Sequence, residues 1–196
     1  MFISYSTSFE TPTLNELSAN PSGGPGFNPD LAPSKAHNFE LGWRFTSKEN
    51  KLEATLYTIK TQNEILPYEL ENFPDRDFYR NIGKTTRMGI ELFWEHQKGP
   101  WEWTLSYNYA SLKFDNYILG DNDLSGKHLP GVPQQQFSGL LQYNFSNGWG
   151  SALQTQYIGE LYADDANITQ VAEYFLTNIR LWKSFNQLSF FGGINN

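Results

Sequence analysis

Acidic side chains on neighbouring alternating segments are the first residues in this chain that could do chemistry. Glu91 and Glu95 share the polar face of one segment, and Glu40 and Glu53 lie on the polar faces of two others. Paired carboxylates can act as general acid and general base. No GxSxG, HExxH or phosphate-loop motif accompanies them, so we expect them to bond to water or arginine and expect no enzymatic activity. Their natural partners are the arginines of the same face: Arg44, Arg87 and Arg180.

Metal binding has equally little support in the sequence. The chain has no cysteine, and its histidines (His37, His96 and His128) share no metal-ligand spacing. Segments 121–123 and 164–167 supply carboxylate and amide oxygens, but neither has the glycine and glutamate that complete an EF-hand loop. We therefore predict solvated loops, with no resident metal and no cofactor.

The composition combines a polar average with many aromatic residues. The 196 residues include 14 Lys and Arg against 21 Asp and Glu, which gives a net charge of -7 and argues against nucleic-acid binding. Mean hydropathy is -0.54, yet 16% of the residues are aromatic. Disordered chains are polar but poor in aromatics, and soluble cores are rich in Leu, Val and Ile, so the composition fits neither class. The length allows one domain or part of a larger one.

The elements that position these residues are predicted to be strands. Apolar and polar residues alternate with period two, most clearly over 101–109, where Trp, Leu and Tyr alternate with Glu, Thr, Ser and Asn. Each segment is long enough for a tilted membrane strand of about 9–11 residues. We count about nine such segments: 3–9, 38–45, 51–58, 88–96, 101–109, 137–145, 149–157, 175–182 and 188–194.

The connections between these segments alternate in length. Short turns are expected near 47–50, 98–100, 146–148 and 184–187. Long loops are expected near 10–36, 64–77, 112–133 and 161–171, the first with a helical turn at 11–17. This alternation is typical of an up-and-down antiparallel array, and outer-membrane barrels have short periplasmic turns and long extracellular loops.

Charged and aromatic residues sort by face and by height. Strand charges occupy the polar face, and the exceptions Lys60, His96 and Lys183 fall at strand ends, where long side chains reach water. A soluble β-sandwich also predicts alternation, but it does not predict tryptophans gathered near one set of turns, which indicates an aromatic girdle at a membrane interface. The predicted girdle residues are Trp43, Trp94, Trp101, Trp103, Trp149 and Trp182.

Six motifs carry a family resemblance over essentially the whole chain. In order they are SYSTSFETPTLNEL, NPDLAPSKAHNFELGWR, LEATLYTIKTQNEIL, YRNIGKTTRMGIELFW, LPGVPQQQ and FGGINN. Together they resemble the C-terminal barrel half of TonB-dependent outer-membrane receptors, which transport siderophores and other iron complexes. One departure is Ser34, because the family usually has a glutamate after the preceding proline.

The resemblance implies an all-β fold, an antiparallel up-and-down transmembrane β-barrel of about 22 strands with a plugged lumen. Residues 1–196 would be a partial barrel domain of about nine strands. Both ends fall in strand-like sequence, so we expect the plug, the TonB-contacting segment (TonB box), the early strands and the last strand to be absent. The implied location is the bacterial outer membrane.

The resemblance also implies partners and a ligand. The partners would be outer-membrane lipid and the TonB–ExbB–ExbD system, acting through the absent plug region, with no nucleic acid. The ligand would be an iron–siderophore complex captured by extracellular loops, where arginine suits carboxylate or catecholate oxygens and aromatic rings offer stacking surface. The candidate binding residues are Tyr68, Arg76, Tyr79, Arg80, Tyr117, His128 and Tyr162.

Other functions stay open at this point. A related receptor for cobalamin, a sugar or another nutrient would share every feature above, because loops decide the substrate. A passive porin would lack an upstream plug. A soluble carbohydrate-binding β-sandwich would remain in solution without detergent.

Overall fold

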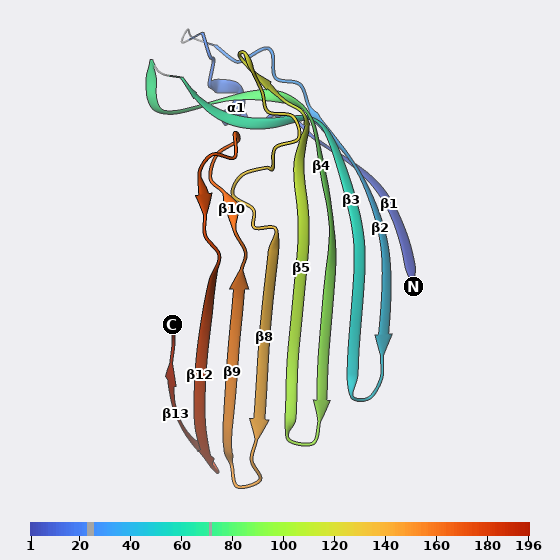
Figure 1. The fold of residues 1–196 in the computed structure, drawn as a ribbon, viewed down its shortest axis with the longest axis vertical. Coiled ribbons are helices and arrows are strands. Elements are labelled where there is room, and N and C mark those ends of the chain that lie inside the picture. The colour runs from blue at the N-terminus through green and yellow to red at the C-terminus, as the bar shows by residue number, and fades with distance from the viewer. Residues whose placement is uncertain (23–25, 71) are drawn as a thin grey trace.

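The main feature of the computed structural model, which describes residues 1–22, 26–70 and 72–196, is one nine-stranded antiparallel sheet (Figure 1). The strand order is β1-β2-β3-β4-β5-β8-β9-β12-β13, so each strand pairs with the strand that precedes or follows it in this up-and-down array. The prediction of about nine antiparallel strands is confirmed. The bounds are β1 (Phe2–Glu10), β2 (Ser34–Thr46), β3 (Asn50–Leu70), β4 (Phe73–Lys98), β5 (Trp101–Asn116), β8 (Gln135–Asn144), β9 (Trp149–Ile158), β12 (Tyr174–Phe185) and β13 (Leu188–Ile194).

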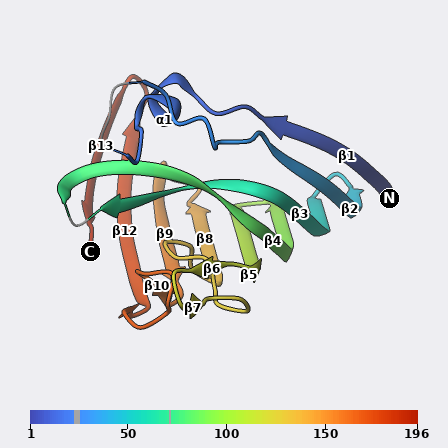
Figure 2. The same ribbon diagram turned by 90° about the horizontal axis from the view of Figure 1, so that it is seen from above.

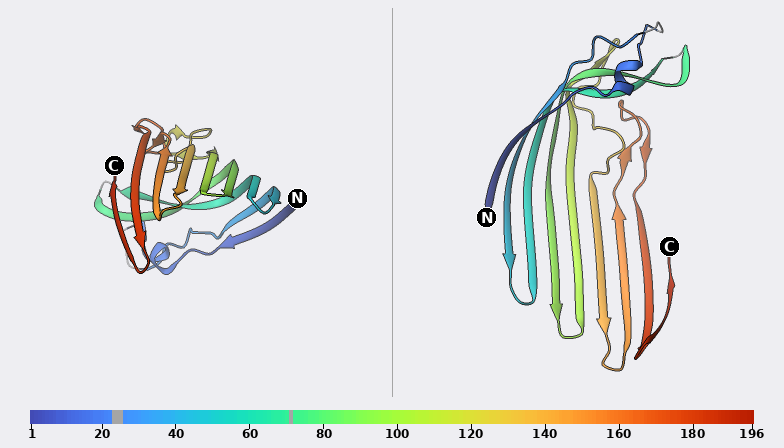
Figure 3. Two further views of the ribbon diagram at one scale, coloured as in Figure 1. Left: turned by 90° about the horizontal axis from the view of Figure 1, so that it is seen from below. Right: turned by 180° about the vertical axis from the view of Figure 1, so that it is seen from behind.

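The sheet curves into an open arc. Seen from above, the strands follow one another around a trough, with β1 and β13 at its two edges (Figure 2). The short connections lie together at one end of the long axis and the long connections at the other (Figure 3). The nine strands form one layer rather than two packed sheets, which is the architecture of a barrel wall and not of a β-sandwich.

The long connections carry small elements of their own. Between β1 and β2 lies α1 (Leu14–Ser18), with Thr13 as its N-cap: the Glu16 amide donates to the Thr13 hydroxyl, and the Thr13 amide donates to the Glu16 carboxylate. The helical turn predicted there is confirmed. The other two loops form small ribbons, β6 (Ile118–Leu119) with β7 (Asn122–Asp123), and β10 (Leu161–Tyr162) with β11 (Gln170–Val171).

The long loop expected at 64–77 is instead a continuation of β3 and β4. Pairing runs on from Glu64–Ile82 to Glu69–Asp77, so the two strands extend well beyond their neighbours as a hairpin. From above, this extension crosses the concave side of the arc toward β12 and β13 (Figure 2). The prediction failed because period-two alternation needs one wet and one apolar side, and the extension lies beyond the zone where that contrast exists.

A change of face occurs where the hairpin leaves the sheet. Asn63 has a φ of 55°, in the left-handed region, and lies between the pairs Gln62–Lys84 and Glu64–Ile82. Below this point odd-numbered residues of β3 and β4, such as Thr61 and Thr85, face the concave side. Above it the even-numbered residues do, since Glu64 bonds to Thr85 and Ile82 joins a buried cluster. A left-handed residue that interrupts the alternation produces this inversion.

The two faces of the sheet differ in chemistry. Leu41, Leu56, Ile90 and Tyr109 form one cross-strand row on the convex face, and the last three are 37–48% exposed. Polar residues line a hollow on the concave face: Glu53, Thr55, Glu91, Asn108 and Gln136. Among the residues that the structure describes, no helix is long and apolar enough to cross a bilayer.

The buried core is small and lies at the long-loop end. Ile82 of β4 and Phe114 of β5 pack there against three loop residues, Tyr117, Leu124 and Leu129. Phe78, farther along the hairpin, is also fully buried. The only substantial apolar burial in the described residues therefore supports the loops, while the apolar side of the sheet remains open.

Candidate functional site

Arg80 is the centre of the candidate site at the long-loop end. Its Nη2 donates to the Tyr117 hydroxyl at 2.8 Å, and its guanidinium lies 4.5 Å from the centre of the Tyr68 ring and 5.5 Å from that of Tyr117. Tyr68 comes from β3, Arg80 from β4, and Tyr117 from the loop that follows β5. Two aromatic rings therefore lie within cation–π distance of the guanidinium.

The same contacts connect three segments at the long-loop end of the sheet. The Tyr117 hydroxyl donates to Asp165 Oδ2 at 3.0 Å, and Asp165 belongs to the loop between β9 and β12. Tyr117 is 2% exposed. Burial raises the pKa of the Tyr117 hydroxyl and the negative charge of Asp165 raises it further, while the positive charge of Arg80 opposes them. Tyr117 is therefore a neutral donor over the physiological range.

One donor of Arg80 remains unused. Its Nε is buried and has no hydrogen-bond partner in the described part of the chain. A buried donor without a partner carries a desolvation cost of about 1–3 kcal/mol. An oxygen acceptor placed beside Arg80 would remove that cost, and a carboxylate or catecholate oxygen suits a guanidinium best.

His128 and Tyr162 form a second ring pair beside this site. Their ring centres lie 5.8 Å apart with an interplanar angle of 25°. Asn167 fixes His128 by accepting from its amide at 2.7 Å and donating to its carbonyl at 2.8 Å. Burial lowers the pKa of His128, and the positive charge of Lys113 lowers it further. His128 is therefore a neutral stacking surface at pH 7.

The acidic segment 164–167 organises the loop itself. Asp164 accepts from the amides of Ile168 and Thr169, and these hydrogen bonds lower the pKa of its carboxyl. Asn167 has a φ of 57°, which a turn at this point requires. Among the described residues no group of three or more His, Asp or Glu side chains is arranged to hold a metal ion.

Two of the seven candidate residues lie apart from the Arg80 site. The guanidinium of Arg76 lies 5.0 Å from the centre of the Phe78 ring and 5.9 Å from that of Phe73, near the hairpin tip. The carbonyl of Tyr79 accepts from Asn28 Nδ2 at 3.0 Å. The structure therefore brings together Tyr68, Arg80 and Tyr117, places His128 and Tyr162 beside them, and leaves Arg76 and Tyr79 outside.

An ion pair at the base of the hairpin was not anticipated from the sequence. Arg87 Nη2 contacts Glu64 Oε1, and Arg87 Nη1 donates to the hydroxyls of Thr61 and Thr85 at 3.1 Å. Thr85 also donates to Glu64. The sequence predicts Glu64 to lie in a loop, and no sequence signal indicates that the strand alternation inverts just before it.

Of the other two arginines of the concave face, only one has the carboxylate partner that the sequence suggested. Arg44 lies 3.7 Å from Glu53, as the sequence suggested. Its guanidinium also lies 4.8 Å from the centre of the Phe2 ring. Arg180 instead lies 4.4 Å from the centre of the Phe191 ring and has no carboxylate partner among the described residues.

The whole chain matches one protein family. The model of the TonB dependent receptor-like β-barrel covers residues 1–196. The chain belongs to this family. The nine-stranded arc is therefore a TonB-dependent receptor β-barrel wall, not closed in this chain.

Solved structures share the fold of this receptor wall. The copper transporter OprC is 18% identical with a TM-score of 0.76, and the match covers 99% of this chain and 30% of that one. The ferric yersiniabactin uptake receptor FyuA from Yersinia pestis is 18% identical with a TM-score of 0.75 (99% and 29%). The siderophore receptor PiuA from Acinetobacter baumannii is 20% identical with a TM-score of 0.74 (98% and 28%). The chain thus spans less than a third of the structures it matches.

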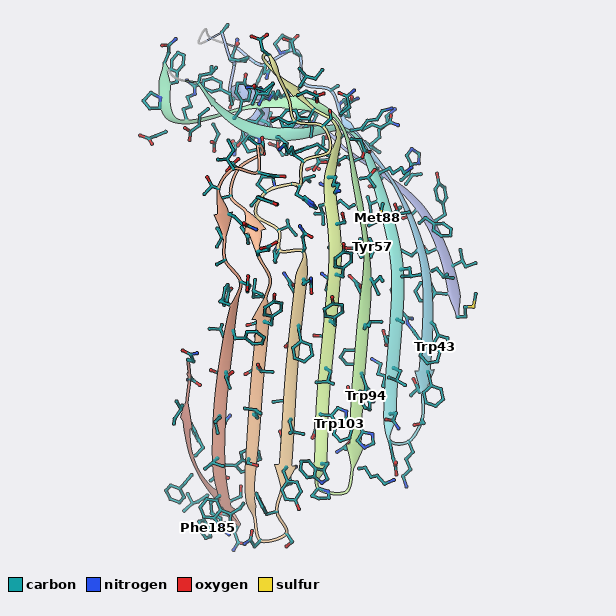
Figure 4. All side chains as sticks on the ribbon, in the orientation of Figure 1. Trp43, Tyr57, Met88, Trp94, Trp103 and Phe185 are labelled. Atoms are coloured by element: carbon teal, nitrogen blue, oxygen red, sulfur yellow. The ribbon has the colours of Figure 1, made fainter. Side chains whose placement is uncertain are left out.

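Five of the six tryptophans of this receptor wall lie on the convex face, and their assignment to an interface girdle stays a prediction. Trp43, Trp94, Trp101 and Trp149 are 36–48% exposed on the convex face, and Figure 4 shows Trp94 and Trp103 near the short-turn end. Trp103 packs edge-on against Trp94 at 5.3 Å.

Trp182 differs from the other five tryptophans. It lies across Gly150 and lines a concave hollow with Arg180 and Gln142. Strand alternation in the sequence also places Trp182 on the same face as Arg180. The position of Trp182 along the strand suits a girdle residue, but its side chain lies on the concave face.

Proposed function

We propose that this chain is part of the wall of a bacterial outer-membrane importer and that its long loops capture an iron–siderophore complex. In the complete receptor, the wall would close into a barrel of about 22 strands around a plug, and the TonB–ExbB–ExbD system would drive release of the ligand inward. The observation that carries the proposal is the Arg80 site, with its unused Nε, in a TonB-dependent receptor barrel.

The chemistry of the site supports an anionic, flat ligand. Arg80 offers a charged donor, Tyr68 and Tyr117 flank it, and the His128–Tyr162 pair adds ring surface on the neighbouring loop. Iron–siderophore complexes carry carboxylate or catecholate oxygens on a large scaffold. The guanidinium of Arg80 suits these oxygens, and the aromatic rings suit the scaffold. Several solved relatives are named for such cargo, including the ferric-catecholate import receptor Fiu from E. coli.

The apolar convex face supports placement in the outer membrane. One large apolar side chain of this face from each of β1, β2, β4 and β12 is 39–64% exposed: Ile3, Trp43, Ile90 and Ile179. Exposed apolar area on this scale is costly in water and stabilising in lipid. The concave face, with its glutamates, arginines and amides, would face the plug and water.

The test is ligand binding by the full-length receptor carrying Arg80→Ala. We expect its affinity for a ferric catecholate or carboxylate siderophore to fall about 10- to 100-fold, as expected when a charged hydrogen bond is lost. Arg76→Ala is the matched control, because Arg76 is an arginine of the same hairpin whose guanidinium lies over Phe73 and Phe78 and not over Tyr68 or Tyr117, and should change affinity less than threefold. Titration calorimetry measures both.

The ligand panel decides between nutrients. It contains ferric catecholate, carboxylate and hydroxamate siderophores, cobalamin, an oligosaccharide and Cu(II). If only cobalamin, the oligosaccharide or Cu(II) binds in an Arg80-dependent manner, the proposal of an importer stands and the proposal of an iron–siderophore ligand is wrong. Equal affinity of wild type and Arg80→Ala for every compound would remove Arg80 from the binding site.

A further inference from the structure

Four lysines gather on the convex face at the long-loop end of β2–β5. The strand register places His37, Lys60, Thr86 and Lys113 side by side in one row. The next row toward the loops contains Lys35, Gln62, Lys84 and Asn116. We call Lys35, Lys60, Lys84 and Lys113 the lysine patch.

The lysines of the patch are exposed and unpaired in the described part of the chain. All four lysines are exposed, and none forms an ion pair with a carboxylate in the described ranges of the chain. The nearby Asp115 accepts from the Thr86 hydroxyl at 2.6 Å. This concentration of positive charge contrasts with a chain whose net charge is -7.

The patch directly borders the apolar band. The row below it contains Phe39, Thr58, Met88 and Ser111, and the next contains Leu41, Leu56, Ile90 and Tyr109. Phe39 and Met88 are 46% and 50% exposed. On each of the four strands the last large apolar residue and the lysine are four residues apart, about 13 Å along the strand. Lipids present the same order, from acyl chains to headgroup.

We propose that the lysine patch binds the headgroup of an anionic lipid that carries at least two phosphates, in the leaflet at the long-loop end. Strands are about 4.8 Å apart, so Lys60 and Lys113, like Lys35 and Lys84, are separated by about 10 Å. That spacing suits two separate phosphates better than one. Lysine is a point charge on a flexible stem and binds phosphate without a fixed fork, and each lysine near a charged lipid strengthens binding about fivefold.

The proposal rests on the membrane placement proposed above but not on the identity of the imported ligand. The lysines lie on the convex face, whereas Arg80 and Tyr68 lie on the concave side of the hairpin. Lipid binding and iron-complex binding therefore use opposite faces, and each can be removed without the other.

The test compares lipid binding by the purified full-length receptor and its Lys60→Gln/Lys84→Gln variant in detergent. The probes are diphosphoryl lipid A, monophosphoryl lipid A and phosphatidylethanolamine, and native mass spectrometry measures the bound fraction. Wild type should prefer the diphosphoryl form, and the variant should bind it about 25-fold more weakly. The control is Lys48→Gln/Lys127→Gln, which removes two exposed lysines outside the patch and should retain wild-type binding.

The possible results of the lipid-binding test either support or overturn the proposal. Equal binding of the three lipids, or equal loss in both double variants, overturns the proposal, as does capture of soluble inorganic phosphate or an acidic protein in place of lipid. Siderophore titration of the same samples separates the two proposals. A receptor that shows lysine-dependent lipid binding but binds no iron complex contradicts the proposed function alone.

Discussion

At the residue scale, two glycines of the concave face each lie beneath an aromatic ring from the neighbouring strand. A Cβ atom added to Gly150 would lie 2.0 Å from Trp182 Cε2, and one added to Gly42 would lie 2.0 Å from Phe2 Cε1. A ring that covers a glycine shields its backbone and fixes the register of the pair. Trp182 therefore has a structural role inside the wall.

Gly150→Ala should consequently destabilise the full-length receptor. The Trp182 ring must shift to admit the methyl group, and such overpacking costs about 1–3 kcal/mol. Gly192→Ala is the control, because nothing lies within 4 Å of a Cβ at that strand position. Urea unfolding in detergent measures both, and equal midpoints for the two variants would contradict the packing role of Gly150.

The sequence predicted the residue types of the candidate site better than their contacts. Arg80 and Tyr117 could be proposed because charged and aromatic residues in long loops suit an anionic ligand. Asp165, which accepts from Tyr117, is 48 residues away in the chain, and no local pattern indicates such a pairing. The face of the hairpin on which Arg80 lies could not be predicted either, because it depends on the face change at Asn63.

At the element scale, alternation predicted the strands of the wall because lipid on one side and water on the other impose period two. The same physics explains the failure at 64–77. Pro67 and Pro74 also interrupt the pattern there, and β3 and β4 nevertheless remain paired beyond the rim, with a bulge near Glu69. The strands whose alternation is imposed by lipid and water could therefore be predicted from the sequence. The hairpin extension, which only tertiary contacts hold in place, could not.

The Glu64–Arg87 ion pair should hold the hairpin in place over the concave side. Arg87→Met removes the cation from a partly buried carboxylate, and we expect the hairpin to open more readily, by about 1–2 kcal/mol. Hydrogen exchange of amides in 64–82 should accelerate about tenfold, while exchange in 50–62 stays unchanged. Arg44→Met, which breaks a more exposed pair, serves as control. Unchanged exchange in 64–82 would show that the pair does not restrain the hairpin.

At the scale of the whole molecule, composition and architecture have one explanation. Mean hydropathy is negative because half of every strand faces the concave side and the loops are polar, while many of the aromatic residues lie on the convex face or in the loop core. The sheet has open edges at β1 and β13. Both edges and the apolar face need partners, which in this family are further strands and lipid.

The isolated 196-residue chain should therefore not fold stably in water. Its buried core is confined to the loop end, and the apolar convex face would drive association. We expect no cooperative thermal transition in detergent-free buffer by circular dichroism. A monomeric sample with a sharp transition would contradict this expectation, and the full-length receptor in detergent supplies the positive control.

The inversion at Asn63 sets a rule for transplanting the hairpin into another receptor. Below it, even-numbered residues of β3 and β4 lie on the convex face; above it, the even-numbered Tyr68 and Arg80 lie on the concave side. A graft cut above Asn63 and joined to an uninterrupted host strand would carry Tyr68 and Arg80 but turn both to the convex side. The transferable unit therefore begins at Asn63.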